Sequence, residues 1–174
     1  MAIKREFVRK KIGEFTIPVL TLELGEDIET GLLLTIDKKT GLAIKADHTT
    51  WNEQEKPAIG VVPYSSLEGW GEEFKFNRPE VLKKGEVIDI YQYGILYSPE
   101  IHAEIKEAES EEEIDENGTI AKYINAPVFL GTEGKVSLKP QTTGNKGAQR
   151  VGYLANPKTG AVRIMIEDRG VNKP

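Results

Sequence analysis

Apolar and polar residues alternate in short runs along most of the chain, and turn-forming residues separate these runs. The alternation is clear in residues 13–24 and again in residues 42–46. A period of two is typical of β-strands that have one buried face. Many short strands at this spacing predict a mainly β fold, in the form of a compact β-sandwich or a small barrel.

The segments predicted to form strands are apolar or alternating, and clusters of turn-forming residues bound them. They are residues 13–24, 31–36, 42–46, 57–64, 86–97, 119–131, 135–139, 149–155 and 161–168. Residues 86–97 are expected to form one long strand, in which Val87 and Asp89 share a face.

One short helix is predicted over residues 99–109. Ser98 is a favoured capping residue, and the proline that follows it suits the first helical position. Ile101, Ile105 and Ala108 recur at helical spacing. Because this apolar stripe is thin, we expect a helix on the surface.

Composition excludes several classes of protein. The 174 residues include no cysteine, so disulfides, thiolate metal sites and a cysteine nucleophile are excluded, and the 2 histidines leave little for a metal centre. The chain has no apolar run of about 20 residues and no apolar region after its basic start, so we expect neither a membrane span nor a signal peptide. The expected protein is made in a cytoplasm. Its net charge of −5 argues against nucleic acid as a partner.

Negative charge is concentrated in residues 104–116, where eight carboxylates stand against one lysine for a net charge of −7. We interpret this run as a solvated surface segment. The alternative is a calcium loop, but Ile124 stands where such a loop needs a bidentate glutamate, so no specific metal is expected. The residues that fall near other positions of such a loop are Glu113, Asp115, Asn117, Gly118 and Ile120.

The N-terminal residues 1–12 combine positive charge with apolar side chains. Five basic residues stand against Glu6, and the apolar side chains include Ile3, Phe7 and Val8. A purely solvated tail has no need of such apolar groups, so we expect this arm to contact another molecule. The alternative is that the arm packs on its own domain as the first strand.

The two halves of the chain carry a similar order of features. Each has an apolar strand, a glycine turn, a strand that alternates with lysine, and a strand with a central glycine. The turn glycine and the central strand glycine are Gly41 and Gly60 in the first half, and Gly134 and Gly152 in the second half. The predicted division is a basic arm at 1–12 and one β-rich domain at 13–174, with pseudo-repeats at about 29–97 and 120–168 and an acidic connector at 98–119.

Catalytic motifs are scarce, and we expect no catalytic residue, no cofactor and no metal. His48 lies in a loop-like stretch and His102 in the predicted helix, where a surface position explains each of them. Ser65 and Ser66 have no histidine near them in the sequence, and an outward strand position accounts for Asp89. The many carboxylates leave a small hydrolase with a carboxylate pair open as a third hypothesis.

Four aromatic residues lie in two loop-rich regions: Trp51, Trp70, Phe74 and Phe76. They suit a sugar-stacking platform or a protein contact, although such residues more often hold long loops against a core. A carbohydrate-binding β-module that uses Trp51 and Trp70 is therefore the alternative to a structural protein.

The order of these motifs resembles the capsid cement, or head decoration, proteins of tailed bacteriophages. The resemblance covers about residues 13–167, and the chain departs from the family pattern in segment 64–84. The matching pieces are GEFTIPVLTLEL (13–24), GLLLTI (31–36), AIGVV (58–62), GEVIDIYQYGIL (85–96), APVFLGTEGKVSL (126–138), QRVGYLA (149–155) and TGAVRIMI (159–166).

The resemblance implies a β-tulip-like fold and a structural role rather than an enzymatic one. Such proteins bind the outside of an assembled head, often as homotrimers, and reinforce contacts between subunits of the major capsid protein. The implied location is the virion, on the outer surface of the capsid. The residues expected to contact the capsid or a neighbouring copy are Ile3, Arg5, Phe7, Val8, Arg9, Trp51 and Trp70.

Overall fold

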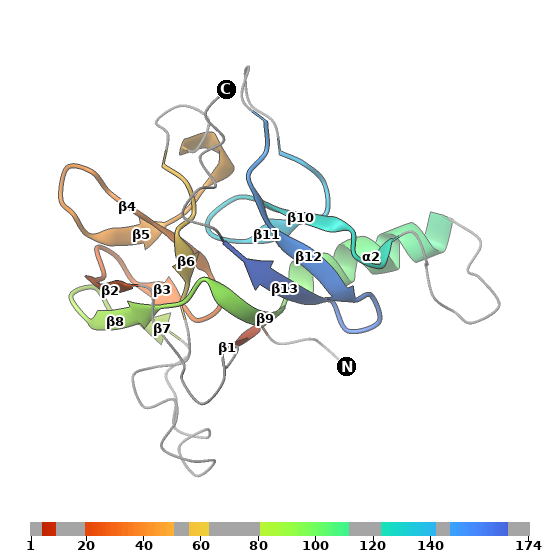
Figure 1. Cartoon of the computed structure of the whole chain (residues 1–174), viewed down its shortest axis with the longest axis horizontal. Helices are drawn as coiled ribbons and strands as arrows, with labels where there is room; N and C mark the ends of the chain where they lie inside the picture. Colours follow the sequence, from red (N-terminus) through yellow and green to blue (C-terminus); the bar gives the residue numbers. More distant parts are fainter. Residues whose placement is uncertain are drawn as a thin grey trace, which may run out of the picture.

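The computed structural model describes residues 5–9, 20–50, 56–62, 81–111, 123–141 and 147–166. As the alternation predicts, the fold is mainly β, with a curled half-barrel sheet and few helices (Figure 1). The elements are β1 (Glu6–Arg9), β2 (Leu20–Glu23), β3 (Ile28–Glu29), β4 (Leu33–Ile36), β5 (Ala43–Lys45), β6 (Gly60–Val61), β7 (Val81–Leu82), β8 (Val87–Ile90), β9 (Tyr93–Tyr97), α2 (Pro99–Glu111), β10 (Pro127–Leu130), β11 (Val136–Ser137), β12 (Arg150–Asn156) and β13 (Ala161–Met165).

The largest sheet has the strand order β1-β9-β13-β12-β10-β11, and every neighbouring pair is antiparallel. Its strands come from both ends of the chain, since β1 pairs with β9 and β9 pairs with β13. The register shifts between Val128 and Phe129 where β10 meets β12. Such irregularities bend a strand and increase its twist, which suits a sheet that curls.

The other strands form three smaller sheets, with the orders β2-β8, β3-β7 and β5-β4-β6. Isolated bridges connect the β2-β8 pair to the β5-β4-β6 sheet: Leu24 pairs with Ala43, and Val61 pairs with Tyr91. In Figure 1 these strands lie together on one side of the molecule, and the six-stranded sheet with α2 lies on the other.

Two apolar clusters form the core, and β4 runs between them. Leu33 belongs to the cluster beneath the six-stranded sheet, whereas Leu32 and Leu34 belong to the cluster inside the smaller sheets. Both faces of β4 are therefore buried, which explains why Leu33 and Leu34 are consecutive apolar residues.

The prediction of one long strand over residues 86–97 is wrong. The run breaks at Tyr91 and Gln92, so that β8 pairs with β2 while β9 enters the six-stranded sheet. Tyr91 and Gln92 are consecutive and both buried, which a regular strand with one open face does not allow. The chain turns a corner here between two sheets.

The predicted helix is confirmed at its start, and α2 runs two residues further than expected, to Glu111. The N–H of Ile101 donates to Ser98 Oγ at 3.2 Å, which is the capping bond that the sequence predicts. α2 lies at the surface with one side packed against the core. Ile101 and Ile105 are fully buried in the first core, although Lys106 on the other side is exposed.

Of the expected N-terminal arm, the structure describes residues 5–9, and these residues form part of the domain. β1 is hydrogen-bonded along β9, and Phe7 is 1% exposed within the first core. The Arg5 guanidinium forms ion pairs with Glu29, at 3.0 Å, and with Glu100 at the start of α2. This is the alternative arrangement, in which the arm supplies the first strand.

Candidate docking face

One face of the six-stranded sheet points away from the core. Ile95, Arg163, Tyr153 and Pro127 stand directly opposite one another across β9, β13, β12 and β10. Residues paired in this way project to the same face of a sheet. A second pair on this face joins Tyr93 to Met165. We call this surface the open face, and its residues are Tyr93, Ile95, Pro127, Tyr153, Arg163 and Met165.

The open face is apolar and aromatic, and it is partly exposed. Tyr93 is 37% exposed and Met165 is 39% exposed, which makes them two of the most exposed large apolar side chains described. Buried side chains such as Val162 and Ile164 alternate with those of the open face along β13. Large exposed apolar groups that gather on one surface are typical of interaction sites.

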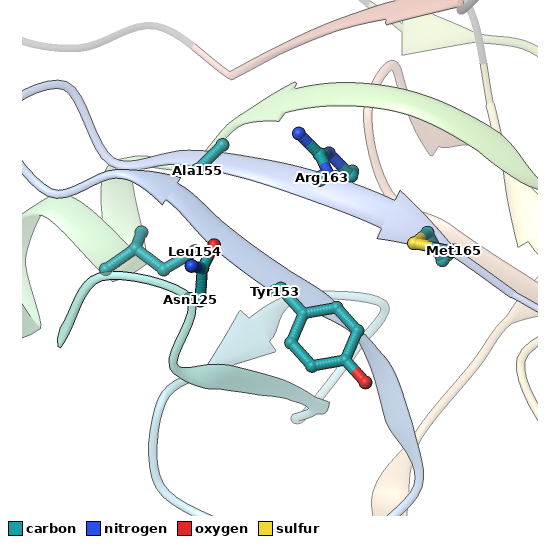
Figure 2. Close-up of a pocket in the computed structure, with 6 residues that line it drawn as sticks. All are labelled: Asn125, Tyr153, Leu154, Ala155, Arg163 and Met165. Atoms are coloured by element: carbon teal, nitrogen blue, oxygen red, sulfur yellow. The ribbon is translucent and has the colours of Figure 1, made fainter.

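A hollow of ≈ 260 Å³ lies on this face (Figure 2). Its lining comes from β12, from β13 and from the turn before β10, where Asn125 adopts a φ of 60°. The residues around it are Asn125, Tyr153, Leu154, Ala155, Arg163 and Met165. The hollow thus combines an aromatic ring, a thioether, an amide and a guanidinium.

Two arginines supply the charge of this region. The guanidinium carbon of Arg150 lies 5.0 Å from the centre of the Tyr153 ring, which is the geometry of a cation–π contact. Arg150 and Arg163 are both exposed, and neither forms an ion pair with another described residue. Arg5 differs, because two carboxylates neutralise it. The open face can therefore accept an acidic group beside its aromatic surface.

Among the residues predicted to contact a partner, the two whose side chains are described, Arg5 and Phe7, do not lie on the open face. Ile3, Trp51 and Trp70 lie outside the described residues. Phe7 is buried in the core, so its side chain is not available to a partner, and Arg5 is ion-paired within the domain. In β1, Val8 stands opposite Ile95 and Arg9 stands opposite Gly94.

The described groups considered for catalysis come from separate parts of the chain, and Asp89 has a side-chain partner. The backbone N–H of His48 donates to Gly131 O at 2.9 Å, and the hydroxyl of Thr21 donates to Asp89 Oδ1 at 2.7 Å. His102 lies on α2. Ser65, Ser66, Phe74, Phe76 and the calcium-loop residues 113–120 lie outside the described residues, and Ile124 is exposed.

Ionisable groups with shifted pKa values lie in turns and surface pairs. A hydrogen bond from the Lys83 side chain lowers the pKa of Asp27, and Asp27 in turn raises the pKa of Lys83. The backbone N–H of Lys39 and the hydroxyl of Thr40 lower the pKa of Asp37. Each shift has a local structural cause, and none of these groups belongs to the open face.

Neither a metal-holding cluster nor a membrane-spanning helix occurs in the parts of the chain that the structure describes. No group of three or more histidine, aspartate or glutamate side chains there could hold a metal ion. Among the same residues, no helix has the length and apolar character needed to cross a membrane.

The sequence did carry a signal for the open face that the analysis of motifs missed. Residues 93, 95 and 97 and residues 163 and 165 occupy the positions that alternate with the core in β9 and β13. A solvated sheet face normally carries mostly polar residues there, but these positions hold tyrosine, isoleucine and methionine beside one arginine.

Comparison with known protein families, with curated proteins and with solved structures gives no match.

Proposed function

We propose that the protein is a non-enzymatic head decoration protein, which binds the outer surface of an assembled phage capsid and stabilises contacts between major capsid subunits. The observation that carries this proposal is the open face, because its chemistry suits protein binding. Tyrosine, methionine and arginine are enriched in protein–protein interfaces. The resemblance of the sequence to head decoration proteins supports the same function.

The sheet that carries the open face suits a scaffold for docking. Its strands are joined to one another by antiparallel hydrogen bonds from β1 to β11, so the side chains of the open face are held at fixed spacing. A capsid offers many equivalent sites, and contacts of modest strength act together when several copies are linked. A homotrimer on the shell is part of this proposal.

The predicted pseudo-repeat and sandwich also remain proposals. The strand orders support the pseudo-repeat. β4 lies between β5 and β6 in one half, and β10 lies between β11 and β12 in the other. In each half the middle strand pairs on one side with the strand that follows it in the sequence, β5 or β11. On its other side it pairs with the strand that carries the glycine, β6 or β12. Two sheets on either side of a shared core support a sandwich-like packing.

Co-sedimentation with empty heads of the phage that encodes the chain tests the function. The wild-type protein is expected to pellet with heads and to stay in solution without them. Replacement of Tyr93 and Met165 by serine should reduce the pelleted fraction, because it removes exposed apolar surface from the open face.

A matched control removes an exposed apolar side chain elsewhere. Val87 on β8 is 62% exposed and is not part of the open face, so Val87→Ser should leave head binding unchanged. If the wild-type protein fails to pellet with heads, the proposed function is wrong. If the open-face variant binds heads as well as the wild-type protein does, the capsid contact lies on another surface.

A further inference from the structure

The open face leaves positive charge without an acidic partner among the described residues. Arg163 lines the hollow, and Arg150 stacks on Tyr153 at the rim of the same surface. A guanidinium pairs well with a carboxylate, since its N–H groups can donate two parallel hydrogen bonds. The open face therefore suits a segment that brings carboxylates to an aromatic surface.

The same chain contains such a segment. Residues 104–116 carry a net charge of −7, although the whole chain carries only −5. The run begins within α2, whose last turn contains no basic residue. Negative charge near the C-terminal end of a helix is unfavourable, because the backbone carbonyls there are already partly negative. A cationic partner would offset this repulsion.

Within one copy, α2 and the open face lie on opposite sides of the sheet. Ile101 and Ile105 share the first core with Val162 and Ile164, which alternate with Arg163 along β13. The C-terminal end of α2 points away from the strands in Figure 1. The described part of the acidic segment lies on α2, so it does not reach the open face of its own copy.

We propose that the open face binds the carboxylates at positions 111–116 in the acidic segment of a second copy. This inference rests on the proposed function, in which neighbouring copies associate on the shell. It assigns the open face to that contact between copies. The contact is head-to-tail, because it joins two different surfaces. Contacts of this kind close into rings or extend into filaments, and a ring gives a direct route to a trimer.

Charge reversal on each side of the contact provides the test, with molecular mass measured by sedimentation velocity at low and high salt. The wild-type protein should form a species larger than a monomer that dissociates as salt increases. Arg150→Glu with Arg163→Glu should raise the dissociation constant by about 100-fold, because like charges then face each other. Glu111→Lys, Glu112→Lys and Glu113→Lys together should have a similar effect.

The chain that carries both sets of reversals should associate again, because the two surfaces are complementary once more. The matched control is Lys38→Glu with Lys158→Glu, which changes the net charge equally at exposed positions outside the open face and should leave association unchanged. Thermal unfolding of each variant checks that the fold is intact.

Several results would overturn the inference. They are a wild-type protein that stays monomeric at low salt, arginine reversals with no more effect than the control, and no recovery in the combined variant. Failure of the proposed function is distinguishable, because it appears as loss of head binding by a wild-type protein that still associates with itself. If the arginine reversals abolish head binding but not self-association, the open face binds the shell and the inference is wrong.

Discussion

Two three-stranded units have the same strand order but different surroundings. The first unit is β5-β4-β6 and the second unit is β11-β10-β12. In each unit a glycine stands opposite the middle strand: Gly60 opposite Leu34, and Gly152 opposite Val128. The first unit is covered on both faces of β4, whereas the second unit carries part of the open face on β10 and β12.

The difference shows how the packing around a unit determines which residues of a strand are buried. Leu33, Leu34 and Thr35 of β4 are all buried because two cores contact this strand, whereas burial alternates along β10 because one of its sides faces outward. The units also join directly. The Gly134 N–H donates to Ala46 O at 2.6 Å, and Gly134 O accepts from the Leu33 N–H at 2.8 Å. The β10–β11 turn of the second unit is thus fixed to the first unit.

The largest expected effect separates the two strand glycines. A Cβ at residue 152 would lie 2.1 Å from Arg163 O in the backbone, whereas at residue 60 the nearest atom, at 2.1 Å, is Cγ2 of the Ile90 side chain. We expect Gly152→Ala to destabilise by about 3 kcal/mol and Gly60→Ala by about 2 kcal/mol. Urea unfolding measures both changes.

A second substitution sharpens this contrast. Ile90→Leu removes the branch that a new Cβ at residue 60 would meet, so it should recover part of the loss in Gly60→Ala. It should not rescue Gly152→Ala. Equal losses for the two glycine variants, with no rescue of either, would contradict this account.

The turn glycines of the two units provide the next comparison. Gly41 and Gly134 both have positive φ, but Gly41 has open space around it, whereas a Cβ at residue 134 would lie 2.8 Å from Leu33 O. We expect Gly41→Ala to cost about 1 kcal/mol from backbone strain alone and Gly134→Ala about 2.5 kcal/mol from strain and overlap. A smaller loss for Gly134→Ala than for Gly41→Ala in urea unfolding would show that the turn is not fixed to the first unit.

Gln149 forms a side-chain link between the units. Its Oε1 accepts from the Ala58 N–H at 2.8 Å, and its Nε2 donates to Ala58 O at 3.0 Å, so one amide satisfies both backbone groups. Gln149→Ala leaves buried polar groups without partners and should cost about 2 kcal/mol. Gln141→Ala, which removes one long hydrogen bond at a more exposed position, is the control and should cost much less.

The smallest expected effect concerns Asp47, which accepts from the Thr49 N–H at 2.9 Å and from the Glu133 N–H of the second unit at 2.8 Å. Asp47→Ala should cost about 1 kcal/mol at neutral pH. Burial alone would raise the pKa of Asp47, but these hydrogen bonds and that from the Thr49 hydroxyl outweigh burial and lower the pKa below 3.8.

A lowered folded-state pKa fixes the direction of the pH dependence. The contribution of Asp47 to stability is complete above its ordinary pKa of 3.8 and is lost as pH falls through the lower folded-state pKa. The difference between wild type and Asp47→Ala in urea unfolding should therefore shrink in acid. A difference that stays constant down to the lowest pH at which the protein folds would contradict this assignment.

The sequence predicted what depends on local pattern. The strands of both units and the start of α2 at Pro99 could be read from apolar or alternating runs and from capping. What it did not predict depends on packing between distant segments. The corner at Tyr91 and Gln92 exists because two sheets meet there, and no local signal marks that meeting.

The candidate site was predicted least well, because the search followed charged and aromatic residues in loops. The open face is assembled from β9, β10, β12 and β13, and its side chains become neighbours only through strand pairing. Phe7 was placed on a partner surface for the same reason. An apolar residue in a basic segment fits a docking arm or a core strand equally well until its pairing with β9 is known.

Glu104 illustrates how the end of a sheet can be sealed. Its carboxylate accepts from the Ser137 hydroxyl and from the Leu138 N–H, both at 2.7 Å, beside the terminal strand β11. An unpaired N–H at a sheet edge can recruit a strand from another molecule and start fibril growth. By occupying that donor, a side chain from α2 makes this edge a poor template for the addition of a strand from another molecule.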